Sequence, residues 1–180
     1  MNFYLIVLTL LFQTIPLNIE KEKILWSESY KLSWADFQAK PNIGSGFVAS
    51  TNSGISFSYS FSYSEEKGDF DLDFTIQSNF YPTLSWYIAS EVTENTLKHE
   101  QTHFDISELH ARLLRKKISE TIFSKNIKKE MDTFYNTIEN MRKEMQLRFD
   151  NETDHSNIRN KELEWEEFVA RQLKAFAKWK

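Results

Sequence analysis

Residues 55–76 read ISFSYSFSYSEEKGDFDLDFTI, and this stretch decides the first half of the fold. Apolar residues alternate with serine up to Tyr63, and they alternate with aspartate or threonine from Phe70 onward. Alternation with a period of two is typical of strands that bury one face. Gly68 lies in the polar segment between the two runs and marks a turn. We therefore predict an antiparallel hairpin with one aromatic face and one small polar face.

The second half of the chain is predicted to be helical. From Glu91 to the end, the sequence contains neither Gly nor Pro. Three helices fit this part, at about 92–123, 126–148 and 158–178, and the apolar residues of the second recur at helical spacing. The fold class that we expect is α+β, in which a small antiparallel β-sheet is followed by a helical half of about three helices.

Length, charge and cysteine content exclude several classes of protein. A chain of 180 residues suits a single domain, which we place at residues 18–180, with an irregular segment up to about residue 45. The formal net charge of -4 provides no field that would attract nucleic acid, so we expect no nucleic-acid partner. The chain contains no cysteine, which excludes disulfides, Cys-based zinc sites and thiol catalysis.

The N-terminus has the pattern of an export signal. The first seventeen residues carry no charged side chain, and Phe3 to Phe12 form an apolar run that is short for a membrane span. We predict that residues 1–17 are a cleaved signal peptide, so that the protein is secreted or periplasmic and touches a membrane only if this segment stays uncleaved. An uncleaved anchor and a buried first helix are the alternatives.

The stretch His99-Glu100-Gln101-Thr102-His103 matches the pattern His-Glu-x-x-His within the first predicted helix. Residues four apart lie on one face of a helix, so His99 and His103 can bind one metal ion at about 2.0 to 2.1 Å each. The carboxylate of Glu100 flanks the pair and can accept a proton from a metal-activated water molecule. We predict a Zn²⁺ site with these two histidines as ligands and Glu100 as the general base.

A catalytic zinc ion usually has three protein ligands and a water molecule, so a third ligand is required. His110 lies about 10 Å further along the same helix, which favours a packing role. An antiparallel pair of helices would return the polar link of residues 149–156 to the motif, and we predict that His155 in this link is the third ligand. The alternatives are the acidic residues of the link and of the third helix, namely Asp150, Asp154, Glu162 and Glu166.

The motif resembles that of a known family. Leu97 to Ile106, LKHEQTHFDI, resemble the core Leu-Lys-His-Glu-Gln-x-His-Phe-Asp-Ile of a bacterial domain of unknown function whose members are labelled predicted secreted zinc-dependent proteases. Weaker similarity spans about residues 30–170 and includes Phe149 to His155, which resemble a closing motif aromatic-Asp-x-x-Thr-x-His-Gly. The resemblance implies an exported protein with a zincin-like site, and it supports His155 as a ligand. Thr102 and Ser156 depart from glycines of the family pattern.

Together these observations predict an exported zinc metallopeptidase with a zincin-like domain and a peptide or protein substrate. The hairpin region of residues 46–78 could hold an extended peptide by strand addition. Two other classes stay open. One is a metal-binding module without turnover, in which four protein ligands close the zinc site. The other is a helical interaction protein in which the motif arose by accident.

Overall fold

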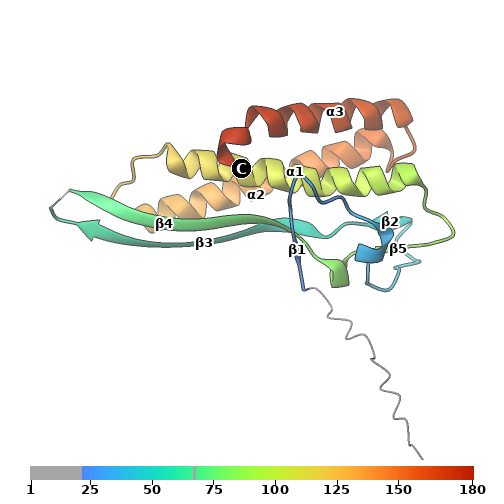
Figure 1. Cartoon of the computed structure of the whole chain (residues 1–180), viewed down its shortest axis with the longest axis horizontal. Coiled ribbons are helices and arrows are strands. Elements are labelled where there is room, and N and C mark those ends of the chain that lie inside the picture. The colour runs from blue at the N-terminus through green and yellow to red at the C-terminus, as the bar shows by residue number, and fades with distance from the viewer. Residues whose placement is uncertain (1–21, 67) are drawn as a thin grey trace, which may run out of the picture.

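The structure is a computed structural model that describes residues 22–66 and 68–180, and it has the predicted α+β class (Figure 1). A small antiparallel sheet precedes three helices. The predicted signal peptide lies outside the described residues. No helix within the described ranges is long and apolar enough to cross a membrane. The elements are β1 (Ile24–Leu25), η1 (Trp34–Asp36), β2 (Ala49–Ser50), β3 (Ser53–Ser64), β4 (Asp69–Phe80), η2 (Pro82–Leu84), β5 (Trp86–Tyr87), α1 (Glu94–Ser119), α2 (Ile127–Thr153), α3 (Arg159–Ala175) and η3 (Ala177–Trp179).

The predicted hairpin is confirmed and is longer at its open end than predicted. β3 and β4 pair antiparallel from Ser53 opposite Phe80 to Ser64 opposite Asp69, and β1 pairs with the other edge of β4. The aromatic face packs toward the helices, with Ile55 and Ile76 buried in a cluster that includes residues of α1 and α2. The far end of the hairpin projects beyond the helices (Figure 1).

α1 is the central helix and contacts α2, α3, β3 and β4. It begins after Thr93, whose side chain accepts a hydrogen bond from the backbone N–H of Thr96, as a good N-cap does. Because neighbours surround the helix, its polar motif residues are also removed from solvent. His99 and Glu100 are each only 4% exposed. Buried polar groups of this kind need partners or a function.

α2 is longer than predicted, and the predicted boundary near residue 148 is wrong. The helix continues to Thr153, so most of the expected polar link is helical. Phe149 and Thr153, one turn apart, are both fully buried, and this packing outweighs the weak helix propensity of the intervening Asp, Asn and Glu. The helix ends at Asp154 in a left-handed conformation. As predicted, α2 runs back along α1 and brings its end to the motif.

A second, two-stranded sheet was not predicted from the sequence. β2 pairs antiparallel with β5, and the backbone N–H of Ile88 donates to the carbonyl of Val48. Thr51 then fixes this segment to the motif helix, because its hydroxyl donates to the carbonyl of Glu100 at 3.2 Å. Strands of two residues carry too little periodicity to be recognised in a sequence. The sheet places the chain before β3 alongside the first turns of α1.

Candidate metal centre

Three potential ligand atoms converge between α1 and α2. They are Nε2 of His99, Nε2 of His103 and Oδ1 of Asp150. The two ring nitrogens are 3.1 Å apart, and the carboxylate oxygen lies 3.1 Å from the first and 2.9 Å from the second. The histidines are one helical turn apart, as predicted, and Asp150 comes from the last turn of α2. The sequence motif and the end of α2 thus build one site.

These distances suit a metal ion. For metal–ligand bonds of about 2.0 to 2.1 Å, the ligand atoms of a tetrahedral site are about 3.3 to 3.4 Å apart, so only a small outward movement is needed. Two imidazole nitrogens and one carboxylate oxygen also match the ligand types of catalytic zinc sites. The group of His99, His103 and Asp150 could therefore hold a metal ion.

Glu162 on α3 orients the ring of His99. Oε1 of Glu162 lies 2.7 Å from Nδ1 of His99, and this carboxylate is fully buried. Because an ionised carboxylate can only accept, Nδ1 is the donor, and Nε2 directs its lone pair at the converging atoms once it has lost its own proton. A carboxylate behind a ligating histidine is a common second contact in metal sites, where it fixes the tautomer and raises the basicity of the ring.

In the protein without metal, the contacts among these converging atoms shift the pKa values of His99 and Asp150. Burial lowers the pKa of His99, but hydrogen bonds with Asp150 and Glu162 outweigh this effect and raise it to about 9. Burial raises the pKa of the Asp150 carboxyl, but the contacts with His103 and His99 outweigh this effect and hold the pKa well below the usual range. A proton therefore occupies the position between these atoms when no metal is bound, and a metal ion must displace it.

Aromatic packing fixes the two histidine rings. Phe149 is fully buried and stacks on His99 with ring centroids 4.4 Å apart, and its edge meets the ring of His103 at 5.2 Å. Trp165 of α3 packs on the other side of Phe149 at 5.5 Å. The apolar contacts among the three helices therefore hold the ligands in place.

Glu100 lies beside this group and has the properties expected of a general base. Its side chain lines the same cleft as the three ligand atoms, although the residue is only 4% exposed. Its Oε2 atom is buried and has no hydrogen-bond partner among the described residues. Leaving a buried carboxylate oxygen without a partner is costly, and a water molecule or substrate bound in the cleft could supply the partner.

The cleft has a volume of about 640 Å³ and runs between the β2 segment and the ends of α1 and α2. Its walls contain hydroxyl and amide side chains and several carboxylates, and none of the described residues that line it is Lys or Arg. The carboxylates that line the cleft are those of Glu91, Glu100, Asp150 and Asp154. When no cation is bound, the cleft is therefore polar and negatively charged.

His155 lines the cleft but is not one of the three converging residues. Its Nδ1 atom is 3.9 Å from Oδ1 of Asp150, its side chain is 45% exposed, and its ring packs on Phe47 at 4.7 Å. The structure instead brings Asp150, one of the alternatives, to the two motif histidines. The assignment of His155 as a ligand stays a prediction.

The other sequence candidates lie elsewhere. Asp154 lines the cleft without joining the converging atoms, and Glu166 forms an ion pair with Arg159 at 2.9 Å. His110 is fully buried, and its Nδ1 atom is 2.8 Å from the carbonyl of Ile106, which confirms a packing role. The contact of Glu162 with the far nitrogen of His99 was missed. It depends on how α3 docks on α1, and no spacing in the sequence reports that.

The Glu162→Gln variant is expected to weaken metal binding by about 10- to 100-fold, because it removes the negative charge that fixes the tautomer of His99. Glu166→Gln, four residues along the same helix, is the matched control and should leave the affinity within about twofold, since its partner is the half-buried Arg159 and not a residue of the site. Competition with a chromophoric chelator measures both affinities. Equal affinities for the two variants would show that Glu162 has no part in the site.

Comparisons with known proteins place the chain in a bacterial context. The profile of the family described as "Bacterial protein of unknown function (DUF922)" matches residues 31–156, which include β2 to α2 and all three converging residues. No curated protein and no solved structure matches the chain.

Proposed function

We propose that this chain, which belongs to the bacterial family of unknown function whose profile matches residues 31–156, is an exported zinc-dependent metallopeptidase that acts on peptide or protein substrates. The observation that supports this most is the position of Glu100. A buried carboxylate with an unpartnered oxygen lies in a cleft beside two histidines and an aspartate that could hold a metal ion. Export is inferred from the apolar N-terminal sequence.

The proposed chemistry is hydrolysis by an activated water molecule. A zinc ion bound to the three ligands would supply a Lewis acid that makes water nucleophilic near neutral pH and polarises the substrate carbonyl. Glu100 accepts the proton of the attacking water and then delivers it to the leaving amine. Glu162 keeps the ring of His99 in the tautomer that ligation needs, and Phe149 keeps water from the rear of both histidines.

We propose that the substrate lies as an extended chain along residues 46–51. This segment forms one wall of the cleft beside Glu100, and one edge of β2 is occupied by β5. An extended peptide can add to the other edge by main-chain hydrogen bonds. This refines the expectation that the whole hairpin region of residues 46–78 serves this purpose, because most of β3 and β4 extends away from β2 (Figure 1), which lines the cleft.

A zinc-binding module without turnover is the second candidate. The exposed ring of His155 is 3.9 Å from the carboxylate of Asp150, so a rotation of this ring could provide a fourth ligand. A site with four protein ligands is closed to substrate and serves to tie helices together. In that case Glu100 would have no chemical role.

The proposal is tested by incubating the zinc-loaded protein with a diverse peptide mixture and identifying new termini by mass spectrometry. We expect cleavage that stops when a chelator removes the metal and returns when zinc is added. Protein that binds zinc tightly but cleaves nothing in the mixture would favour the module. Cleavage that persists in the metal-free protein would exclude zinc catalysis and point to a contaminating enzyme.

A further inference from the structure

The outer edge of β3 is unusual for an exposed edge strand. In the described part of the chain, the sheet has the order β1-β4-β3, so no further strand lies beyond β3. The strand has 12 residues, SGISFSYSFSYS, and none of them is charged or proline. Natural sheets usually protect such an edge with a charged residue, a proline or a bulge, because its free N–H and C=O groups invite another strand. β3 has none of these protections.

The alternation of backbone hydrogen bonds shows which residues of β3 face outward. On β4, the carbonyls of Ile76 and Ser78 point away from β3, because they accept hydrogen bonds from Arg115 and from the backbone N–H of Trp26. In an antiparallel pair, the residues opposite them on β3 also turn their N–H and C=O groups outward. These are Phe57 and Ile55, and the same alternation continues along the strand through Tyr59, Phe61 and Tyr63.

The side chains at the end of this edge are aromatic and about half exposed. Phe61 is 42% exposed and Tyr63 is 51% exposed, and both meet the ring of Phe70 across the hairpin. The tip of the hairpin extends beyond the helices (Figure 1), while Phe61 lines a hollow with residues 125–129 at the start of α2. Exposed aromatic side chains next to free backbone groups are what an additional strand would bury.

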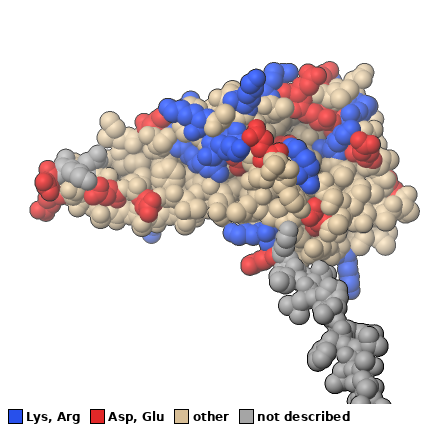
Figure 2. Space-filling view, in the orientation of Figure 1, with Lys and Arg blue, Asp and Glu red and all other residues tan. Residues whose placement is uncertain are grey.

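The chemistry of the two sheet edges indicates which partner fits. Acidic side chains gather at the tip of the hairpin, while much of the remaining hairpin surface is uncharged (Figure 2). Two copies that met along β4 would bring Asp71 and Asp73 of each copy together, and like charges across strands are unfavourable. Two copies that met along β3 would pair serine with serine and aromatic with aromatic. The β3 edge is therefore complementary to itself.

We propose that the protein forms a two-fold symmetric dimer by antiparallel pairing of β3 with β3 of a second copy, centred on Ser60. The hydroxyl of Tyr135 already donates to the outward carbonyl of Ile55 at 3.3 Å, which ends the open part of the edge. The remaining outward residues run from Phe57 to Tyr63. Only one antiparallel register uses all four of these residues. It pairs Phe57 with Tyr63 of the second copy and Tyr59 with Phe61 of the second copy, and so places Ser60 opposite Ser60 of the second copy.

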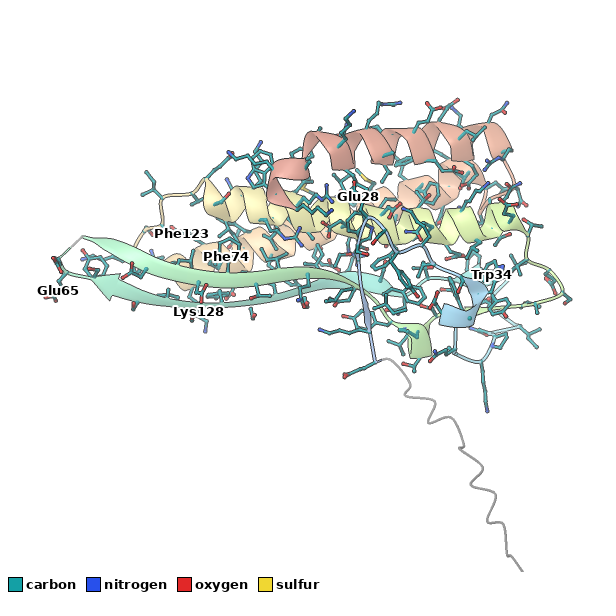
Figure 3. All side chains as sticks on the ribbon, viewed as in Figure 1. Glu28, Trp34, Glu65, Phe74, Phe123 and Lys128 are labelled. Carbon is teal, nitrogen blue, oxygen red and sulfur yellow. The ribbon has the colours of Figure 1, made fainter. Side chains whose placement is uncertain are left out.

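Such a dimer leaves both clefts open. Glu65 lies near the hairpin tip, whereas Trp34 lies at the opposite end of the molecule, next to β2 and β5 (Figure 3). Trp34 stacks on Tyr87 of β5, whose partner strand β2 lines the cleft. Dimerisation and the proposed hydrolysis are therefore independent, and either can fail without the other.

A single introduced cysteine tests both the dimer and its register, because the chain contains no cysteine of its own. In the proposed dimer, Ser60 lies opposite Ser60 of the second copy in a pair without backbone hydrogen bonds, where the short distance between the two Cα atoms suits a disulfide. Ser60→Cys is expected to form a disulfide-linked dimer under mild oxidation at least about tenfold faster than Ser58→Cys, because pairing holds the Ser60 positions at millimolar effective concentration. The Ser58 positions of the two copies would be about 13 Å apart. Equal rates for these two exposed positions would overturn the proposal.

Sedimentation of the protein without cysteine provides the second measurement. We expect a concentration-dependent species of twice the single-chain mass, which Phe61→Lys abolishes because a lysine at this edge opposes strand addition. Phe47→Lys, at an equally exposed aromatic residue near the cleft, is the control and should leave the dimer unchanged. A wild-type protein that stays monomeric would overturn the proposal, even if the monomer bound anionic vesicles through Phe61 and Tyr63. Growth beyond a dimer would overturn the two-fold pairing.

Discussion

The Glu100→Gln variant is expected to bind zinc as tightly as the wild-type protein and to lose peptide hydrolysis by about 10²- to 10⁴-fold, the usual contribution of a general base. Glutamine has nearly the same shape as glutamate, so the cleft keeps its form, but it cannot accept the proton of the attacking water. The two nitrogens and the oxygen that would bind the metal belong to other residues. Zinc affinity and turnover should therefore separate in this variant.

Stability provides a check on this interpretation. Since Oε2 of Glu100 is buried without a hydrogen-bond partner, the substitution breaks no hydrogen bond of this atom, and the melting temperature of the metal-free protein should stay close to that of the wild type. Glu91→Gln, which alters another carboxylate of the cleft, should keep turnover within about fivefold. A Glu100→Gln variant that unfolds more easily and binds zinc weakly would indicate a structural role instead.

The Asp150→Asn variant is expected to weaken zinc binding by more than about 100-fold, whereas His155→Ala should weaken it by less than about tenfold. Loss of a ligand costs more than loss of a group hydrogen-bonded to a ligand, which costs about 10- to 100-fold. His155 should cost less than either, because its Nδ1 atom is 3.9 Å from Oδ1 of Asp150, too far for a hydrogen bond. Oδ1 of Asp150 lies within 3.1 Å of both motif nitrogens, whereas the ring of His155 is exposed and packs on Phe47. Competition with a chromophoric chelator gives both affinities.

The reverse order of these two effects would restore His155 as the third ligand. It would mean that the end of α2 rearranges when metal binds, since three consecutive residues there, Asp154, His155 and Ser156, have positive φ values. Such conformations are strained for residues other than glycine. Large losses in both variants would indicate four protein ligands and favour the module without turnover.

Much of the site could be predicted from the sequence because it depends on local geometry. The spacing of His99 and His103 determines that the two rings share a helix face, whatever surrounds the helix. The alternation of Phe and Ser around Tyr59 likewise determines a strand with one aromatic face. The return of α2 to the motif followed from an antiparallel pair of helices, and it correctly placed the segment that contains Asp150 beside the two histidines.

The remaining features depend on tertiary contacts, which the sequence does not report. Phe149 extends α2 because it packs among residues of α1 and α3, and this extension orients Asp150 rather than His155 toward the rings. Glu162 reaches His99 only because α3 docks on α1. The pairing of β2 with β5 depends on two residues in each strand, which is too short for a pattern.

The most direct test of the metal centre is the metal content per chain of the purified protein, measured beside that of His103→Ala. We expect about one zinc ion per wild-type chain and little or none in the variant, because three protein ligands are the usual minimum for such a site. A folded wild-type protein that contains no metal and takes up no added zinc would contradict the proposed metal centre.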